Sequence, residues 1–291
     1  MQQVLLNIII SGFLYLLLAQ SFSIIFLTTK FFHIAHAAII SFGAYFTFFF
    51  FQKCSLSLWV AIPFSILISI LLGLLIELVI YKPLRKKKTP SLLILIASLG
   101  LYVFLQNLIS LFWGDDTKNL RSGDIKIGYN IFEARITSIQ ISLIFISAIL
   151  FVLVSVFLKF HKVGKNIRAV SANIELADIL GINSENIILW TFGIGSGMAA
   201  FVGILVASDT GLTPTMGFNL LLYGTVVMII GGVGSNWGLI GGAFLLATAQ
   251  HLTTYYMDSK WIDVVTYTIL ILFLIWKPLG FSGTRFKKVE I

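Results

Sequence analysis

The sequence contains few charged residues and a single cysteine. Only 11% of its 291 residues are charged, whereas an average soluble chain is about one-quarter charged. Hydrophobic residues make up 58% of the chain, and the mean hydropathy is +0.99. This composition excludes an ordinary soluble domain and predicts an all-α polytopic membrane protein. The lone cysteine, Cys54, excludes an internal disulfide.

Motifs that would indicate an enzyme are also missing. The chain has no GxxxxGK[S/T] phosphate loop, no HExxH metal motif and no GxSxG nucleophile motif. We therefore expect no catalytic residues, no metal and no cofactor held by this chain. The net charge of +8 does not indicate nucleic-acid binding, because the basic residues lie in short runs between apolar segments, as in cytoplasmic loops.

Apolar segments fill most of the chain and predict a single transmembrane permease domain over residues 1–291. About 20 apolar residues are needed to cross a bilayer. The seventh segment is short and ends in a glycine cluster, so both a full span and a re-entrant element are open for it. The nine segments are Val4–Leu27, Phe31–Phe51, Leu56–Ile80, Ser91–Trp113, Ile139–Leu158, Ile187–Ala207, Phe218–Val233, Trp237–Met257 and Trp261–Trp276.

Three basic clusters predict the orientation of these spans. The loop Tyr81–Pro90 carries five basic residues and no acidic one, which places it on the cytoplasmic side. Counting spans from this loop also places residues 159–186 and the C-terminal tail inside. The loop Gly114–Ser138 and the N-terminus then lie outside. The basic residues of the tail are Lys277, Arg285, Lys287 and Lys288.

The polar interval Gly164–Glu185 is much longer than a turn between two spans requires. Asn173 can cap a helix, and Glu175 would lie in its first turn, near the positive end of the helix dipole. Gly181 is suited to a left-handed helix terminus. We therefore predict a short helix between Asn173 and Gly181. Docking to another protein and an amphipathic connector lying on the lipid surface both fit this pattern.

Few ionisable side chains lie within the predicted spans, and none of the Asp, Lys or Arg residues lies near the middle of one. This argues against coupling to protons or sodium through a buried carboxylate. Glu77 lies near the cytoplasmic end of the third span, where we expect it to pair with Lys82 or Arg85. His33 and His36 have the i, i+3 spacing of one helical face. A metal would need further ligands, so we favour packed polar residues at the start of the second span.

Glycines are concentrated in the run from Gly224 to Gly242. Small residues allow helices to approach closely, and without a phosphate-loop motif we favour tight helix packing over nucleotide binding. We expect these glycines and Gly43, with His33 and His36, to pack helices around a translocation path. The glycines are Gly43, Gly224, Gly231, Gly232, Gly234, Gly238, Gly241 and Gly242.

Six patches spread over nearly the full chain resemble the permease subunits of ABC importers for branched-chain amino acids. They also resemble the sister importers for urea and short amides. One departure is Ala37, which follows His36 where glycine is usual, and another is the abundance of phenylalanine in the second span. These departures leave the solute open. The patches are FHIAHA (Phe32–Ala37), ELVIYKPLR (Glu77–Arg85), IASLGLYVFLQN (Ile96–Asn107), RAVSANIELADILGIN (Arg168–Asn183), IGGVGSNWGLIGG (Ile230–Gly242) and WKPLGFSG (Trp276–Gly283).

The resemblance implies a permease that forms half of a translocation path in the bacterial cytoplasmic (inner) membrane. A second homologous permease would complete the pore, and an extracytoplasmic binding protein would deliver a branched-chain or related neutral amino acid. Cytoplasmic ATPase subunits, which would bind ATP and Mg, would dock on the predicted short helix. The coupling residues would be Asn173, Ile174, Glu175, Ala177, Asp178, Leu180 and Gly181, with Ile174, Ala177 and Leu180 as apolar contacts.

Two alternatives remain open from the sequence. One is a urea or short-amide permease of the same family. The other is a channel or secondary carrier that acts alone, which would not explain the long cytoplasmic interval. Whether the pore contains a different permease or a second copy of this chain is also open.

Overall fold

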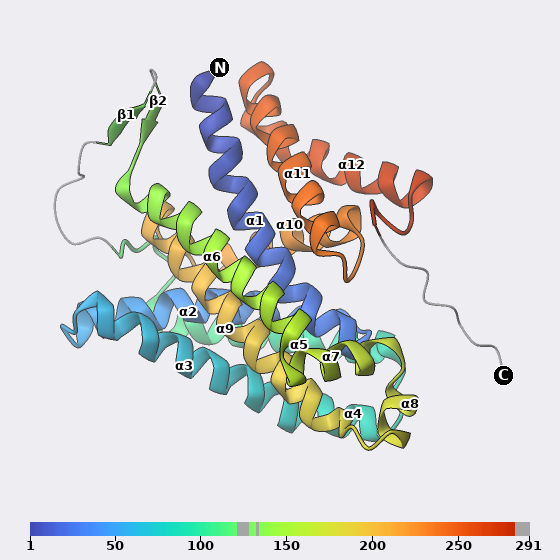
Figure 1. Cartoon of the computed structure of the whole chain (residues 1–291). Helices are drawn as coiled ribbons and strands as arrows, with labels where there is room; N and C mark the ends of the chain where they lie inside the picture. The colour runs from blue at the N-terminus through green and yellow to red at the C-terminus, as the bar shows by residue number, and fades with distance from the viewer. Residues whose placement is uncertain (121–127, 132–133, 283–291) are drawn as a thin grey trace. The chain divides into compact units, whose positions relative to one another are not determined.

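The computed structural model describes residues 1–120, 128–131 and 134–282. The predicted tail residues Arg285, Lys287 and Lys288 therefore lie outside the described residues. Contacts within the chain define two compact units. The first unit comprises Met1–Ser23, Gly128–Ile182 and Tyr223–Ile291, and the second comprises Ile24–Ile127 and Asn183–Leu222. Figure 1 labels the elements of both. The prediction of one domain over the whole chain stays a prediction.

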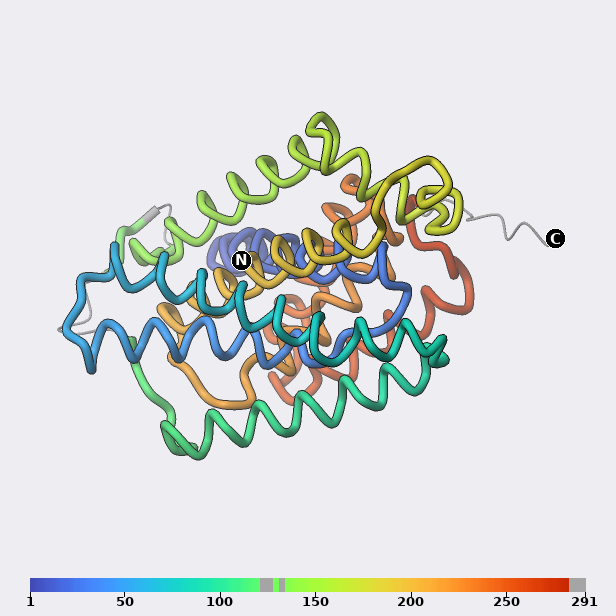
Figure 2. Tube along the Cα trace, turned by 90° about the horizontal axis from the view of Figure 1, so that it is seen from below, coloured from blue at the N-terminus to red at the C-terminus, as the bar shows by residue number. Residues whose placement is uncertain are grey.

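The second unit is built around three helices, α2, α3 and α9, that pack against one another (Figure 2). Twelve of the thirteen residues of α2 are buried, which is expected of a helix that is apolar all round. The other elements extend from these helices or pack beside them. The bounds are Gln2–Thr29 (α1, from Ile24 onward), His36–Phe48 (α2), Phe49–Lys53 (η1), Leu58–Ile76 (α3), Glu77–Tyr81 (η2), Lys82–Lys86 (α4), Ser91–Trp113 (α5) and Ser184–Thr210 (α9).

The first unit contains the N-terminal part of α1 and the C-terminal helices, together with the helices on either side of residue 161. The helix α10 begins in the second unit and continues into the first at Tyr223. The bounds are Tyr129–Ile131 (β1), Ala134–Ile136 (β2), Ser138–Phe160 (α6), Lys162–Ala172 (α7), Ile174–Ile179 (α8), Met216–Gly231 (α10), Asn236–Tyr256 (α11), Ser259–Trp261 (η3) and Ile262–Trp276 (α12).

A short hairpin precedes α6 in the loop predicted to lie outside. Its strands β1 and β2 are antiparallel, with Asn130 opposite Arg135. Thr137 then caps α6 in a reciprocal arrangement: its Oγ1 accepts from the Gln140 amide at 3.2 Å, and its own amide donates to the Gln140 side chain at 3.1 Å. This capping box stabilises the first turn of α6 and explains why the helix begins at Ser138.

Among the described residues, six helices are long and apolar enough to cross a membrane. The seventh predicted segment corresponds to α10, which has only 16 residues. Each of the nine predicted apolar segments overlaps a helix of the structure, but the count of nine spans and their orientation stay predictions. The six helices are Gln2–Thr29, Leu58–Lys86, Ser91–Trp113, Ser138–Phe160, Ser184–Thr210 and Ser259–Trp276.

Candidate functional site

Two helices, α7 and α8, occupy the polar interval between the long helices α6 and α9. The sequence predicted only the second of them. The buried residues of α7 include Gly164, Ile167 and Val170, whose spacing places them on one helical face. Arg168 donates a hydrogen bond to the carbonyl oxygen of Leu158. These contacts join α7 to the end of α6, so the interval is an ordered structure that presents α8.

The short helix α8 forms through local capping at both ends. The Asn173 side chain accepts a hydrogen bond from the Leu176 amide at 3.0 Å, as predicted for an N-cap. At the other end Gly181 has φ of +82°. Its amide donates to the Asp178 carbonyl, and the Ile182 amide donates to the Ala177 carbonyl, both at 3.0 Å. This pair of bonds is the Schellman arrangement, so the glycine terminator is also as predicted.

The exposed face of α8 differs from the predicted one. Ala177 is only 2% exposed, so its side chain packs against this chain. The expectation that Ala177 is an apolar contact for a partner is therefore wrong. Leu176, Ile179 and Leu180 are 54%, 81% and 70% exposed. Their i, i+3, i+4 spacing gathers them on one side of the helix, whereas Ile174 is half-buried. The sequence analysis named Leu180 but missed the other two exposed residues.

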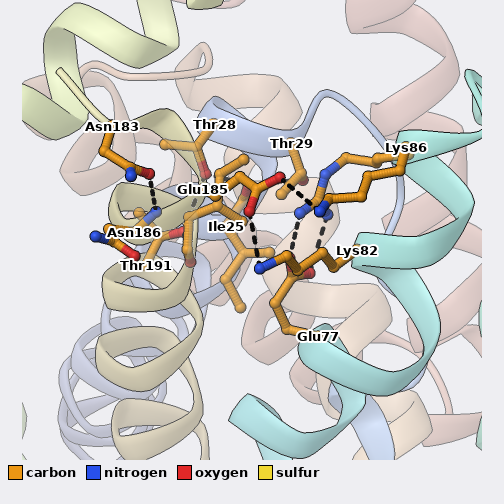
Figure 3. A network of polar contacts seen from close by, with 12 residues as sticks. Ile25, Thr28, Thr29, Glu77, Lys82, Lys86, Asn183, Glu185, Asn186 and Thr191 are labelled. Atoms are coloured by element: carbon orange, nitrogen blue, oxygen red, sulfur yellow. Dashed lines mark hydrogen bonds and ion pairs between the residues drawn. The ribbon is translucent and has the colours of Figure 1, made fainter. Parts of the chain in front are cut away.

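A charged cluster lies where the chain continues from α8 into α9 (Figure 3). Lys82 Nζ lies 2.8 Å from a Glu185 carboxylate oxygen, and Lys86 Nζ lies 3.6 Å from the other. Arg85 donates to both carboxylate oxygens of Glu77, one of them at 2.9 Å. Of the two partners expected for Glu77, Arg85 is therefore the one that pairs with it. The cluster connects α4 to the first turn of α9.

The start of α9 is held by two further polar contacts in the same region (Figure 3). The Asn183 side chain accepts from the Asn186 amide at 3.0 Å and caps the helix. Thr28 on α1 and Thr191 on α9 place their hydroxyl oxygens 3.0 Å apart. The helix α9 begins only a few residues after Gly181 closes α8. Its contacts with Thr28 and Lys82 anchor it to α1 and α4 within the second unit.

The second predicted span is interrupted before it becomes helical. Residues 30–35 are not helical, Lys30 has φ of +56°, and α2 begins only at His36. The Ala35 amide donates to Ser98 Oγ on α5 at 3.0 Å, which satisfies a backbone group that a continuous helix would have paired internally. The expectation that His33 and His36 share a helical face is therefore wrong, because His33 precedes the helix.

A buried polar chain runs from this interruption into α5. His33 Nδ1 lies 2.9 Å from the Tyr81 hydroxyl, which donates to Ser98 Oγ at 2.7 Å. The Tyr81 hydroxyl therefore connects the His33 ring to Ser98 on α5. His33 and His36 are both fully buried, with ring centroids 5.5 Å apart. The pair is packed among neighbours, in agreement with the interpretation preferred from the sequence.

Several of the predicted glycines lie at or beside a tight turn between α10 and α11. A Cβ atom added to Gly238 would lie 1.9 Å from the Gly231 carbonyl oxygen, and one added to Gly242 would lie 2.8 Å from the Val227 carbonyl oxygen of α10. Real Cβ atoms do not approach so closely, so the two helices touch backbone to backbone. Gly232 and Gly234 have φ of +92° and +88°, which favours glycine at the turn itself.

The other predicted glycines differ in how closely they pack. A Cβ atom on Gly43 would lie 2.5 Å from the Ala200 Cα in the second unit, and one on Gly224 would lie 2.7 Å from Leu18 Cγ in the first. Gly241 has only an ordinary contact, 3.6 Å from the Phe281 ring. At Gly43 and Gly224 the missing side chain therefore allows close helix packing. Their place on a translocation path stays a prediction.

The sequence is similar to known proteins over nearly its full length. A family described as "Branched-chain amino acid transport system / permease component" matches residues 4–274. The chain belongs to this permease family. It is 30% identical to the high-affinity branched-chain amino acid transport system permease protein LivH of Escherichia coli K12, over 97% of this chain and 95% of the relative. It is 29% identical to BraD of Pseudomonas aeruginosa over the same shares.

An archaeal relative extends the comparison. The probable branched-chain amino acid transport permease protein LivH of Methanocaldococcus jannaschii is 22% identical over 99% of this chain and 95% of the relative. Family membership and the apolar helices identify this chain as a multi-pass membrane permease and not an enzyme. Among the residues that the structure describes, no three His, Cys, Asp or Glu side chains form a group that could hold a metal.

Sequence reasoning missed three functional candidates of this permease. Leu176 and Ile179 could have been found from the helical spacing around Leu180, had Ala177 been assigned to the inner face. Glu185 entered the sequence analysis only as the last residue of the polar interval. Its contact with Lys82 joins residues far apart in the sequence, and no local pattern indicates it.

Proposed function

We propose that this permease forms half of the translocation path of an ATP-driven importer for branched-chain amino acids in the bacterial cytoplasmic membrane. Membership of the family and the names of its LivH and BraD relatives support this solute class. The scarcity of charge within the apolar helices suits a neutral or zwitterionic solute with an apolar side chain. Selection among such solutes would occur mainly in an extracytoplasmic binding protein.

The importer requires subunits besides this chain. A second homologous permease would complete the pore, and cytoplasmic ATPase subunits would bind and hydrolyse ATP with Mg. This division of labour is supported by the absence of a phosphate-loop motif in the sequence. A permease that does not hydrolyse ATP itself needs a surface on which the ATPase subunits dock, and α8 would provide that surface.

The observation that carries this proposal is the exposed apolar face of α8. Leu176, Ile179 and Leu180 are all more than half exposed on one short helix that is capped at both ends. Exposed apolar patches of this kind mark interaction sites. A connector lying on lipid would also bury such a face, so the test must detect the ATPase itself.

Transmission from α8 into the membrane helices follows from the chain itself. Only residues 180–183 separate the end of α8 from the start of α9, and Asn183 caps α9 at once. Glu185, in the first turn of α9, contacts Lys82 at 2.8 Å. Movement of α8 by the ATPase would therefore pull on the start of α9, which would carry α4 with it.

The test is recovery of the ATPase subunits with tagged permease from native membranes. We expect Ile179→Asp with Leu180→Asp to reduce recovery at least about tenfold, because burial of each such side chain contributes about 1.5–3 kcal/mol. Lys162→Asp with Lys165→Asp, at exposed positions of α7, is the matched control for two added carboxylates and should leave recovery unchanged. Elution of each variant as a single species in detergent verifies folding. Normal ATPase recovery with the double variant would overturn the docking assignment.

A further inference from the structure

An apolar groove runs along the surface of the second unit between α3 and α9. Its volume is about 520 Å³, and its lining includes Ile70, Leu74 and Leu78 on one side and Asn186, Trp190 and Gly193 on the other. The i, i+4, i+8 spacing of the first three residues forms a straight apolar wall. The groove is open to the surroundings, since Trp190 is 54% and Leu78 is 46% exposed.

One end of the groove meets the charged cluster of Figure 3. Leu78 precedes Lys82 by about one helical turn. On the facing wall Asn186 directly follows Glu185, which contacts Lys82 at 2.8 Å and Lys86 at 3.6 Å. Asn186 is also the polar residue of the lining. The groove is therefore polar and basic at the Leu78 end and apolar along the rest of its length.

The charge at this end is unbalanced. Five basic residues, Lys82, Arg85, Lys86, Lys87 and Lys88, lie within seven positions. Among the residues that the structure describes, the carboxylates that form ion pairs with them are Glu77 and Glu185. Five cations against two carboxylates leave an excess of three positive charges beside an apolar groove. A ligand that matches both features has an anionic head and an apolar tail.

We propose that this groove is a binding site for an anionic glycerophospholipid, with one acyl chain along α3 and α9 and the headgroup phosphate at residues 82–88. Basic clusters next to membrane helices attract anionic headgroups. The volume lies in the range of about 300–1,000 Å³ found for small-molecule sites.

Replacing Gly193 by leucine should block the acyl chain of the lipid without disturbing α3 and α9. A Cβ atom on Gly193 would lie 3.9 Å from Ile70 Cγ2 and from Leu74 Cδ2, so the backbone accepts a side chain and Gly193→Leu would fill the groove. The matched control is Gly100→Leu, because no heavy atom lies within 4 Å of a Cβ atom added to Gly100. Gly100 is exposed on α5, away from the groove.

The experiment is native mass spectrometry of the full-length permease, delipidated in detergent and titrated with phosphatidylglycerol or phosphatidylcholine. We expect the wild type to retain phosphatidylglycerol preferentially. Gly193→Leu should weaken binding of both lipids, and Gly100→Leu should weaken neither. Changing Lys86, Lys87 and Lys88 together to Ala should weaken phosphatidylglycerol alone, by at least about fivefold. The charge-matched control changes the exposed residues Lys159, Lys162 and Lys165 to Ala and should have no effect on retention.

Unchanged phosphatidylglycerol binding in either Gly193→Leu or the Lys86–Lys88 variant would overturn the proposal. A second measurement does not depend on how these variants fold. A photo-crosslinking amino acid at position 190, activated in native membranes, should yield a phospholipid adduct of the permease. A covalent adduct with another protein chain instead would show that a subunit covers the groove, and would also overturn the proposal.

Discussion

The ammonium group of Lys82 lies 2.8 Å from the carboxylate of Glu185, four residues after Gly181 closes helix α8. The contact joins α4 to the first turn of α9 (Figure 3). Both side chains are partly exposed, at 27% and 43%, and exposed ion pairs contribute about 0–1 kcal/mol to stability. The ion pair therefore contributes little to the stability of the fold. We infer that it instead couples the movement of α4 to that of α9.

The first prediction concerns the ion pair between Lys82 and Glu185. Glu185→Gln should leave the recovery of ATPase subunits unchanged, because α8 itself is intact, but should lower leucine uptake per molecule of complex. Its effect on the free energy of unfolding should be less than about 1 kcal/mol. Uptake in proteoliposomes and thermal unfolding measure the two effects. Wild-type uptake would contradict the role given to Glu185, and Asp116→Asn, at an exposed carboxylate after α5, controls for the loss of charge.

The second prediction concerns the buried carboxylate of Glu77. This side chain is 1% exposed and accepts hydrogen bonds from Arg85 at both oxygens. Arg85→Ala would leave the carboxylate buried without its partner, which costs about 3–5 kcal/mol. Adding Glu77→Gln to that variant should recover part of this loss by removing the charge.

Denaturant unfolding in detergent measures the stability of these Arg85 variants. Lys88→Ala, in the same loop and exposed, should change the free energy of unfolding by less than about 0.5 kcal/mol. A similarly small change for Arg85→Ala would show that Glu77 does not depend on this ion pair.

The third prediction concerns close packing of α2 and α9. A Cβ atom on Gly203 would lie 1.9 Å from the Ile40 carbonyl oxygen, a backbone atom that cannot rotate away. Gly203→Ala should therefore force the helices apart and destabilise the permease by about 1–3 kcal/mol. Gly100→Ala is the control, since Gly100 has open space around it. Equal thermal stability of the two variants would refute the close contact.

The fourth prediction concerns the cap of α8. Asn173→Ala removes the acceptor of the Leu176 amide, which costs about 1 kcal/mol. Hydrogen exchange at the amides of residues 174–180 should accelerate, and the ATPase should bind more weakly, because the docking face is less ordered. Asn173→Asp keeps an acceptor at the cap and should behave almost as the wild type. Unchanged exchange in Asn173→Ala would contradict the role of the cap.

Local signals in the sequence predict much of this fold. The segment Ser91–Trp113 coincides with α5 at both ends, because an apolar run after Pro90 defines its start and a glycine follows its end. The short helix α8 was predicted from Asn173 and Gly181, whose effects act within one turn. Apolar length and helix capping are properties of neighbouring residues, so they can be deduced without the tertiary structure.

Features that depend on distant residues were not predictable in this way. The apolar run from Phe31 gives no sign that helix α2 starts at His36, because the hydroxyl that binds the Ala35 amide belongs to Ser98. The choice of Arg85 over Lys82 as the partner of Glu77 likewise depends on Glu185. Periodicity and spacing describe one element at a time, whereas these contacts are set by packing between elements.

Transport in proteoliposomes tests whether this permease works as half of an ATP-driven importer for branched-chain amino acids. The permease would be purified with the subunits that accompany it and reconstituted with its binding protein and labelled leucine. We expect uptake that requires ATP and the ATPase subunits, and that isoleucine and valine inhibit while urea does not. Uptake of leucine by this chain alone without ATP, or ATP-driven uptake of urea in place of leucine, would contradict it.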